Sequence, residues 1–236
     1  MQTVPYREAV CALFYVARMT RFDISHACSQ VARFMARPGR AHWEAVLRIY
    51  RYLNRTKGAA LVMRSQGLDC NVERFMDALS DSDWAGCPTS RRSHTGFMVR
   101  AGGSLVSWTS KRQTTYAQST AEAEYMAATA TANEIVWWRR LCDDFGFRTQ
   151  GPVTLWCDNK SAELLADHEG KFERVKHIQL RYHVLREYQR TGVVDVRWCS
   201  ARKMAADVLT KNCPPRQFRE VVSGVLGRRW CKKKKK

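Results

Sequence analysis

Apolar residues recur at helical spacing over the first part of the chain. The recurring apolar positions in residues 6–19 are Val10, Leu13, Phe14 and Ala17. Such recurrence predicts an amphipathic helix, because positions three and four residues apart share one helix face. Residues 23–35 and 41–53 show the same spacing and are expected to form two further helices. We therefore expect residues 1–60 to form a small helical segment.

After residue 60 the spacing changes, and short runs of β-forming residues alternate with helical segments. The expected strands are 61–63, 75–83, 95–100, 104–109, 153–157 and 193–198. Gly102 and Gly103, between two of these strands, predict a hairpin turn. The expected helices are 120–145, 161–166, 180–189, 205–210 and 217–226. This order predicts an α/β domain around a mixed sheet over 75–212, with a C-terminal helix and a lysine-rich tail over 213–236.

The charge of the chain indicates a polyanionic partner. Apolar residues make up 45% of the 236 residues, an ordinary share for a globular protein, but the net charge of +18 is far from ordinary. Such a charge attracts nucleic acid or anionic lipid through long-range electrostatics. Of these two partners we expect nucleic acid.

Cysteine spacing and hydropathy exclude several other classes of protein. None of the nine cysteines forms a C-x-x-C pair, which excludes zinc ribbons and thioredoxin-like redox sites. Cysteines within apolar segments indicate a reducing compartment. No apolar run reaches the length of a membrane span, and the N-terminus lacks a signal-peptide core. We expect an intracellular protein, in cytoplasm or nucleus, with no membrane partner and no small-molecule cofactor.

Four acidic residues lie at the edges of apolar segments and suggest a metal site. They are Asp81, Glu122, Asp158 and Asp207. Carboxylates are the ligands that Mg²⁺ prefers, and two ions roughly 4 Å apart assist the in-line hydrolysis of a phosphodiester. Crowded carboxylates repel one another without a cation, so such a group makes sense mainly as a cation site. Any single aspartate at a strand end is more often a helix cap or a turn former.

Two of these positions have an acidic neighbour, and spacing alone does not choose between them. Asp83 lies two residues after Asp81 on the same expected strand, so both side chains point to one face. Glu124 lies two residues after Glu122 on the expected helix, roughly 200° around its axis. Only one of these two glutamates can therefore face a shared site.

An ordered set of motifs from residue 81 onward resembles the ribonuclease H domain of copia-type retrotransposon Pol polyproteins. The motifs are Asp81-Ser-Asp-Trp-Ala-Gly, Arg91-Arg-Ser-His-Thr-Gly-Phe, Ser107-Trp-Thr-Ser-Lys-Arg-Gln, Ser119-Thr-Ala-Glu-Ala-Glu-Tyr, Cys157-Asp-Asn-Lys-Ser-Ala, Lys176-His-Ile-Gln-Leu-Arg-Tyr-His and Ala206-Asp-Val-Leu-Thr-Lys. The N-terminal segments Tyr6-Arg-Glu-Ala-Val, Thr20-Arg-Phe-Asp-Ile-Ser and His42-Trp-Glu-Ala-Val-Leu-Arg resemble the end of the reverse transcriptase in the same polyproteins. Family members usually have proline where Phe22 stands, and the basic tail after residue 227 matches nothing in the family.

The resemblance implies a fold, an activity and a set of ligands. The fold is ribonuclease H-like, with a mixed five-stranded sheet flanked by helices and preceded by a small helical segment. The activity is hydrolysis of the RNA strand of an RNA–DNA hybrid during reverse transcription, with a polymerase domain as a candidate partner. The matching ligands of two Mg²⁺ ions, for which Mn²⁺ can substitute, are Asp81, Glu122, Asp158 and Asp207. The alternative function is that of a catalytically silent retrotransposon remnant that binds nucleic acid.

Basic and amide side chains near the hairpin and beside Asp158 are candidates for contacts with the hybrid. A hybrid duplex is recognised mainly through its phosphates and 2′-hydroxyls. The candidates are Arg91, Arg92, Lys111, Arg112, Gln113, Asn159 and Lys160. The two Arg91-Arg92 and Lys111-Arg112 pairs could equally be solvated charges at turns.

Overall fold

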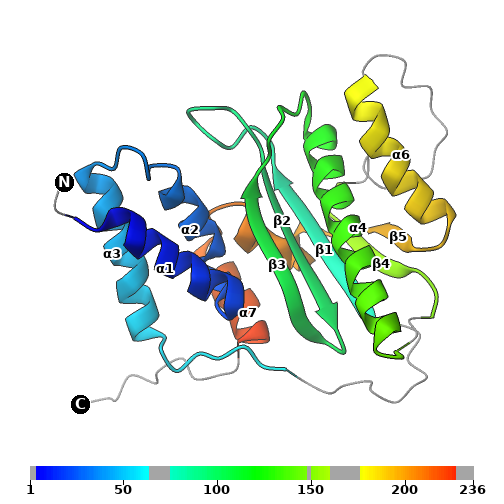
Figure 1. The fold of residues 1–236 in the computed structure, drawn as a ribbon, viewed down its shortest axis with the longest axis horizontal. Helices are drawn as coiled ribbons and strands as arrows, with labels where there is room; N and C mark the ends of the chain where they lie inside the picture. Colours follow the sequence, from blue (N-terminus) through cyan, green and yellow to red (C-terminus); the bar gives the residue numbers. More distant parts are fainter. Residues whose placement is uncertain (1–3, 64–74, 148–149, 160–175, 227–236) are drawn as a thin grey trace. The chain divides into compact units, whose positions relative to one another are not determined.

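The computed structural model describes residues 4–63, 75–147, 150–159 and 176–226 (Figure 1). The chain divides into two compact units, residues 1–62 with 213–236, and residues 63–212. The expected helix over 161–166 lies outside the described residues. Within the described part of the chain, every helix is too short or too polar to cross a membrane.

The first unit is helical, as the apolar spacing predicts. It contains α1 (Tyr6–Met19), a 3₁₀ turn (Phe22–Ile24), α2 (Ser25–Ala32), α3 (Arg40–Arg55) and α7 (Pro215–Val225). Val10, Leu13 and Val46 are among its fully buried residues, so the helical period marks the inner faces. Helix α7 joins this unit, because the rings of Tyr52 and Phe218 lie 6.3 Å apart. The expected strand over 61–63 is reduced to one bridge, between Leu61 and Leu226.

The expected helix over 23–35 is instead a 3₁₀ turn followed by a short α-helix. The turn is fixed by the buried carboxylate of Asp23, which accepts hydrogen bonds from Arg21 at 2.9 and 2.8 Å. The hydroxyl of Tyr52 donates a third hydrogen bond to Asp23, at 2.6 Å. These tertiary contacts determine where α2 begins, and apolar spacing carries no sign of them.

The second unit is built on a mixed five-stranded sheet, which confirms the expected fold class. The strands are β1 (Met76–Asp83), β2 (His94–Ala101), β3 (Ser104–Arg112), β4 (Val153–Cys157) and β5 (Val194–Trp198), in the order β3-β2-β1-β4-β5. β1, β2 and β3 are antiparallel neighbours, whereas β4 runs parallel to both β1 and β5. Gly102 and Gly103, at φ 56° and 75°, close the predicted β2–β3 hairpin.

Helices cover this sheet and position its carboxyl-end edge. Helix α4 (Thr120–Asp144) lies along one face of the sheet, with α6 (Lys176–Arg190) beside it (Figure 1). The core between them is apolar and includes Ala78, Val99 and Leu155. The 3₁₀ helices η2 (Ala201–Lys203) and η3 (Ala205–Leu209) follow β5. Because β1, β4 and β5 are parallel, their carboxyl ends meet at one edge, where α/β sheets commonly bind ligands.

Candidate metal centre

Asp81 and Asp158 are brought together by the parallel pairing of β1 and β4. Ser80 pairs with Cys157 in this ladder, so the two aspartates occupy the next position on each strand. Glu124 of α4 reaches the same place from one face of the sheet. One carboxylate oxygen from each of the three residues lies within 4.8 Å of the other two. This separation suits ligands that share a hard cation.

The side chain of Glu124 is buried at this centre and lacks a complete set of partners. Its Oε1 accepts a hydrogen bond from the backbone N–H of Ser82 at 3.1 Å. Its Oε2 is buried without a hydrogen-bond donor among the described residues. Burial, and then the charges of Asp81 and Asp158, raise the pKa of Glu124 to about 9. A buried carboxylate with one open oxygen is the group that a bound cation would satisfy.

Glu122, the glutamate expected at this centre, lies elsewhere in the structure. Its Oε2 accepts a hydrogen bond from the backbone N–H of Gln118 at 2.7 Å. Its own backbone N–H donates to the Oγ of Ser119, the residue that caps α4, at 3.1 Å. Glu122 therefore closes the first turn of α4, where an acidic side chain also complements the helix dipole. The geometry thus differs from the sequence-based expectation, and Glu124 replaces Glu122 in the cluster.

Asp83, the other acidic neighbour, is the last residue of β1, and its side chain contacts the turn that follows. Its Oδ1 accepts a hydrogen bond from the backbone N–H of His94 at 2.9 Å. Gly86 packs so closely against it that a Cβ there would lie 1.7 Å from the Asp83 Oδ2. These contacts hold the turn between β1 and β2, and Asp83 is not one of the three clustered carboxylates.

Asp207, the fourth expected ligand, reaches the centre from η3 through Lys211. The Lys211 Nζ lies 2.8 Å from the Asp207 Oδ1 and 3.8 Å from the Asp81 Oδ2. The buried hydroxyl of Thr210 also donates a hydrogen bond to the Asp81 Oδ2. The sequence pattern alone does not single out Thr210 or Lys211, although Asp207 and Lys211 have the i,i+4 spacing typical of a helical ion pair.

Gly96 allows η3 to approach the sheet closely enough for these contacts. A Cβ on Gly96 would lie 2.6 Å from the Thr210 Cγ2 and 2.8 Å from the Leu209 Cβ. The hydroxyl of Ser110 on β3 donates to the Leu209 carbonyl at 2.6 Å and holds the same helix. Asp81, which pairs with Gly96 across β1 and β2, thereby meets Thr210.

Burial, and after it the charges of neighbouring carboxylates, raises the pKa of the clustered carboxylates. Burial raises the pKa of Asp81 to about 6, with Lys211 and Thr210 lowering it and Asp207 and Asp158 raising it. The pKa of Asp158 is also raised, chiefly by burial. The all-oxygen donor set, its short separations and the open oxygen of Glu124 fit a hard divalent cation such as Mg²⁺.

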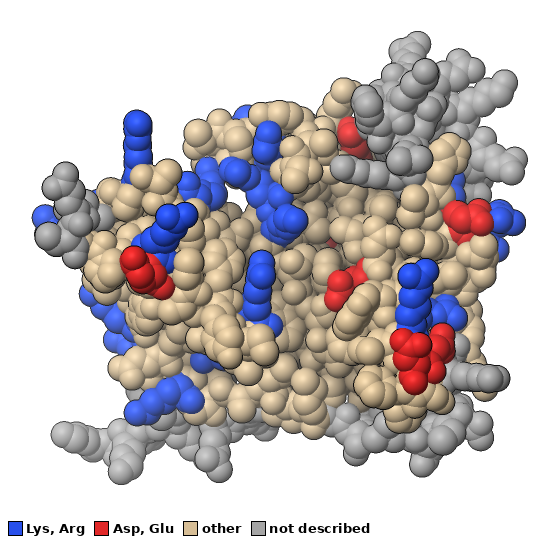
Figure 2. Space-filling model, in the orientation of Figure 1, with Lys and Arg blue, Asp and Glu red and all other residues tan. Residues whose placement is uncertain are grey.

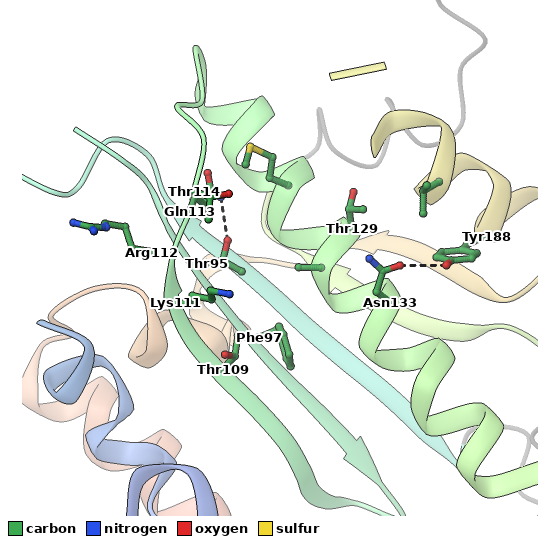
Figure 3. A pocket seen from close by; sticks show the side chains of 13 residues that line it. Thr95, Phe97, Thr109, Lys111, Arg112, Gln113, Thr114, Thr129, Asn133 and Tyr188 are labelled. Atoms are coloured by element: carbon green, nitrogen blue, oxygen red, sulfur yellow. Dashed lines mark hydrogen bonds between the residues drawn. The ribbon is translucent and has the colours of Figure 1, made fainter. Parts of the chain in front are cut away.

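A pocket borders Lys111 and Arg112, the last two residues of β3. Both residues are exposed, and the pocket, of about 610 Å³, lies between β2, β3, α4 and α6 (Figure 3). Threonine and asparagine side chains contribute most of its remaining polar lining: Thr95, Thr109, Thr114, Thr129 and Asn133. In Figure 3 the Lys111 side chain points toward α4, whereas the Arg112 side chain points away from the pocket. The pocket thus combines one cationic side chain with several hydrogen-bonding groups.

Gln113, although it also lines the pocket, is buried. Its Nε2 lies within hydrogen-bonding distance of the Ala123 carbonyl and the Thr95 hydroxyl, at 3.0 Å each, and the Ser82 hydroxyl, at 3.3 Å. It therefore ties the end of β3 to β1, β2 and α4, which is a role in positioning the centre.

The remaining candidates for nucleic-acid contacts have varied surroundings. Arg91 is exposed and has a φ of 50° in the turn before β2. The Arg92 guanidinium lies 5.0 Å from the centroid of the Tyr116 ring. Asn159 is half-buried beside Asp158, and Lys160 lies outside the described residues. Figure 2 shows Lys and Arg side chains spread over the face in view, with acidic side chains in a few places.

Comparison with known proteins identifies relatives over almost the whole chain. The retrovirus-related Pol polyprotein from transposon TNT 1-94 of Nicotiana tabacum is 38% identical over 218 residues, covering 92% of this chain and 16% of that protein. The Pol polyprotein from transposon RE1 of Arabidopsis thaliana is 33% identical over 220 residues, covering 93% and 15%. This chain therefore spans about one-sixth of the length of these relatives.

Comparison with solved structures finds distant likenesses to ribonucleases H. Ribonuclease H1 from Halobacterium salinarum NRC-1 is 19% identical, with a TM-score of 0.40, and the match covers 57% of this chain and 93% of that one. No family model matches the chain. Over almost its whole length, the chain is similar to one part of the retrovirus-related Pol polyproteins of copia-type transposons.

Proposed function

We propose that the unit over 75–212 is a ribonuclease H that hydrolyses the RNA strand of RNA–DNA hybrids with two Mg²⁺ ions. The observation that carries this proposal is the approach of Asp81, Glu124 and Asp158 within 4.8 Å, together with the open buried Oε2 of Glu124. A strongly basic chain that concentrates carboxylates at one sheet edge suits metal-dependent chemistry on a polyanion.

Four carboxylates would hold the ions, and neighbouring side chains would hold the carboxylates. The proposed ligands are Asp81, Glu124, Asp158 and Asp207. Bound Mg²⁺ supplies an activated water and charge stabilisation at the leaving oxygen. Thr210 orients Asp81 through its hydroxyl, and such outer contacts fix the geometry of ligands. Lys211 lies beside Asp207 and Asp81, where its ammonium offsets their negative charge.

The pocket bordered by Lys111 and Arg112 supports a phosphate-binding role. Both cations are exposed, and the hydroxyl and amide groups of the pocket can donate hydrogen bonds to phosphate oxygens. Arg91 and Arg92 add positive charge near the turn that precedes β2. These contacts would position a duplex without reading its sequence.

The relatives suggest the biological setting and the role of the first unit. The relatives are retrovirus-related Pol polyproteins of transposons, and the setting that we propose is reverse transcription, which produces RNA–DNA hybrids. Residues 1–60 would be the C-terminal tail of the reverse transcriptase, and 75–212 the ribonuclease H domain that follows it. A reverse-transcriptase polymerase domain is then the proposed protein partner. A silent chain that binds hybrid is the alternative that the experiment must separate.

The test is cleavage of an end-labelled RNA–DNA hybrid in Mg²⁺ or Mn²⁺ by the parent chain and by Asp158→Asn. We expect the parent to cut the RNA strand, and the Asp158→Asn chain to bind the hybrid without cutting it. Asp83→Asn is the matched control, because that carboxylate contacts the β1–β2 turn. Binding without cleavage by the parent would leave the silent alternative, and added polymerase would show whether a partner is required.

A further inference from the structure

Two exposed tryptophans lie at the same edge of the sheet as the clustered carboxylates. Trp84 directly follows β1 and is 47% exposed, and Trp198 ends β5 and is 40% exposed. Trp84 comes shortly after Asp81, where β1 ends, and Trp198 ends β5, which pairs with the β4 strand that Asp158 follows. Both indoles therefore belong, with the carboxylates, to the carboxyl-end edge of the sheet.

Each indole is anchored through its single polar atom. The Trp84 Nε1 donates to the Ala117 carbonyl at 3.1 Å, just before α4 begins. The Trp198 Nε1 donates to the Asp158 carbonyl at 3.0 Å. Indole has only this one donor, so each ring is fixed by its edge while a large part of its apolar surface stays exposed.

The segment that anchors Trp84 carries a second exposed ring. Tyr116, next to the Ala117 that anchors Trp84, is 59% exposed. The Arg92 guanidinium lies 5.0 Å from the centroid of the Tyr116 ring. A cation held over an aromatic ring gives the segment that anchors Trp84 both ionic and apolar groups for a nucleic acid strand.

We propose that Trp84 and Trp198 are two nonionic contact points for the nucleic acid strand that crosses the carboxylates. Each indole face would pack against a sugar or base of that strand near the bond that is cut. The inference rests on the proposed ribonuclease function. The aromatic contacts would contribute a part of the binding affinity that salt does not screen, in addition to the ionic contacts with phosphates. Aromatic faces bind sugars and bases of any sequence, which suits an enzyme that must accept every hybrid.

Exposure alone does not define such a contact, and the chain offers a matched control. Trp137 on α4 is 54% exposed, but its ring packs edge-on against Trp138 at 5.1 Å. It belongs to the same unit and is as accessible as Trp84. If exposed tryptophans bind nucleic acid without regard to position, Trp137 would contribute as much as the other two.

The test is equilibrium binding of a fluorescent hybrid in EDTA, where no cleavage occurs, at several salt concentrations. We expect Trp84→Ala and Trp198→Ala each to weaken binding about tenfold at every salt concentration. The slope of log affinity against log salt should stay unchanged, because no phosphate contact is lost. Arg92→Ala should instead reduce that slope by about one, and Trp137→Ala should bind like the parent.

Phenylalanine variants guard against loss of folding. Trp84→Phe and Trp198→Phe keep a ring at each position and should bind within about threefold of the parent. Parent-like binding by both alanine variants, or an equal loss in Trp137→Ala, would overturn the inference while leaving the ribonuclease proposal intact. A parent chain that fails to bind the hybrid at all would overturn both.

Discussion

Glu122 and Glu124 are two residues apart in sequence, but Glu124 belongs to the carboxylate cluster and Glu122 to the start of α4. Replacing Glu124 by glutamine should therefore abolish cleavage, whereas replacing Glu122 by glutamine should mainly lower stability. Glu124→Gln removes a carboxylate whose oxygen lies within 4.8 Å of those of Asp81 and Asp158. Loss of an outer-shell partner typically costs 10–100-fold in metal affinity or activity, so loss of a ligand should cost more than about 100-fold. Titration with Mn²⁺ measures the loss of metal affinity, and cleavage of the hybrid measures the loss of activity.

The same substitution should change how stability depends on pH when metal is chelated. The folded pKa of Glu124 is about 9, above its ordinary value of 4.5, chiefly because the side chain is buried. The folded chain therefore binds more protons than the unfolded chain between these values, and its free energy of unfolding falls as pH rises through this window. Glutamine cannot ionise, so Glu124→Gln should be more stable than the parent at pH 8, by about 1–3 kcal/mol, and similar to it at pH 5.

Glu122→Gln should leave the centre intact and weaken the start of α4. The amide oxygen of glutamine can still accept the hydrogen bond from Gln118, but the charge that favours the helix N-terminus is lost. We expect a loss of about 0.5–1 kcal/mol in urea unfolding, with cleavage close to that of the parent. Loss of cleavage in Glu122→Gln, with cleavage kept in Glu124→Gln, would refute the arrangement described here.

Three further substitutions test the contacts that support the two units. Thr210→Val removes the hydroxyl that donates to Asp81 and should weaken Mn²⁺ binding about tenfold by calorimetry; unchanged binding would contradict its orienting role. Gly96→Ala places a Cβ 2.6 Å from the Thr210 side chain and should lower the free energy of unfolding by about 1–3 kcal/mol in urea. Asp23→Asn leaves the buried Arg21 without its counter-charge and should lower the free energy of unfolding by about 3 kcal/mol. Circular dichroism of the helical signal during thermal unfolding measures this loss. A melting curve that matches the parent would show that this ion pair does not hold the first unit together.

The sequence predicts most elements of the fold because their periods are strong and local. The helix over 6–19 is confirmed to the residue, and the β2–β3 hairpin forms at its two glycines. The expected helix over 23–35 loses its first turn to the tertiary contacts of Asp23, and the helix over 205–210 forms as a 3₁₀ helix. Such differences arise where long-range hydrogen bonds outweigh local propensity.

The sequence contains a signal that distinguishes Glu122 from Glu124, although the resemblance to the family does not use it. Ser119 and Glu122 have the S-x-x-E spacing of a capping box, which assigns Glu122 to the helix start. Glu124 instead shares a helix face with Ala128 and Ile135, four and eleven residues later, and both are fully buried. Helical phase alone would therefore have directed Glu124, rather than Glu122, toward the sheet.

The sequence contains no comparable signal for the side chains that support the carboxylates. Their contacts form only when segments far apart in the chain pack together. Thr210 meets Asp81 only because Gly96 leaves room for η3 against β2, and Trp198 reaches the Asp158 carbonyl only because β5 pairs with β4. Each of these contacts joins residues at least 40 positions apart in the chain. Spacing rules describe neighbours within one element, so they cannot rank such residues.

The energetic cost of the carboxylate cluster is itself an argument for its function. Burial raises the pKa of Asp81, Glu124 and Asp158, so the fold holds these groups against their preference for water. Lys211 offsets part of this cost near Asp81 and Asp207, but the Oε2 of Glu124 gains no donor from the described residues. Apolar residues of similar volume would stabilise the sheet edge better. A metal ion would convert this unfavourable arrangement into a favourable one, so chelation should destabilise the protein when the cluster is intact and have little effect in Glu124→Gln.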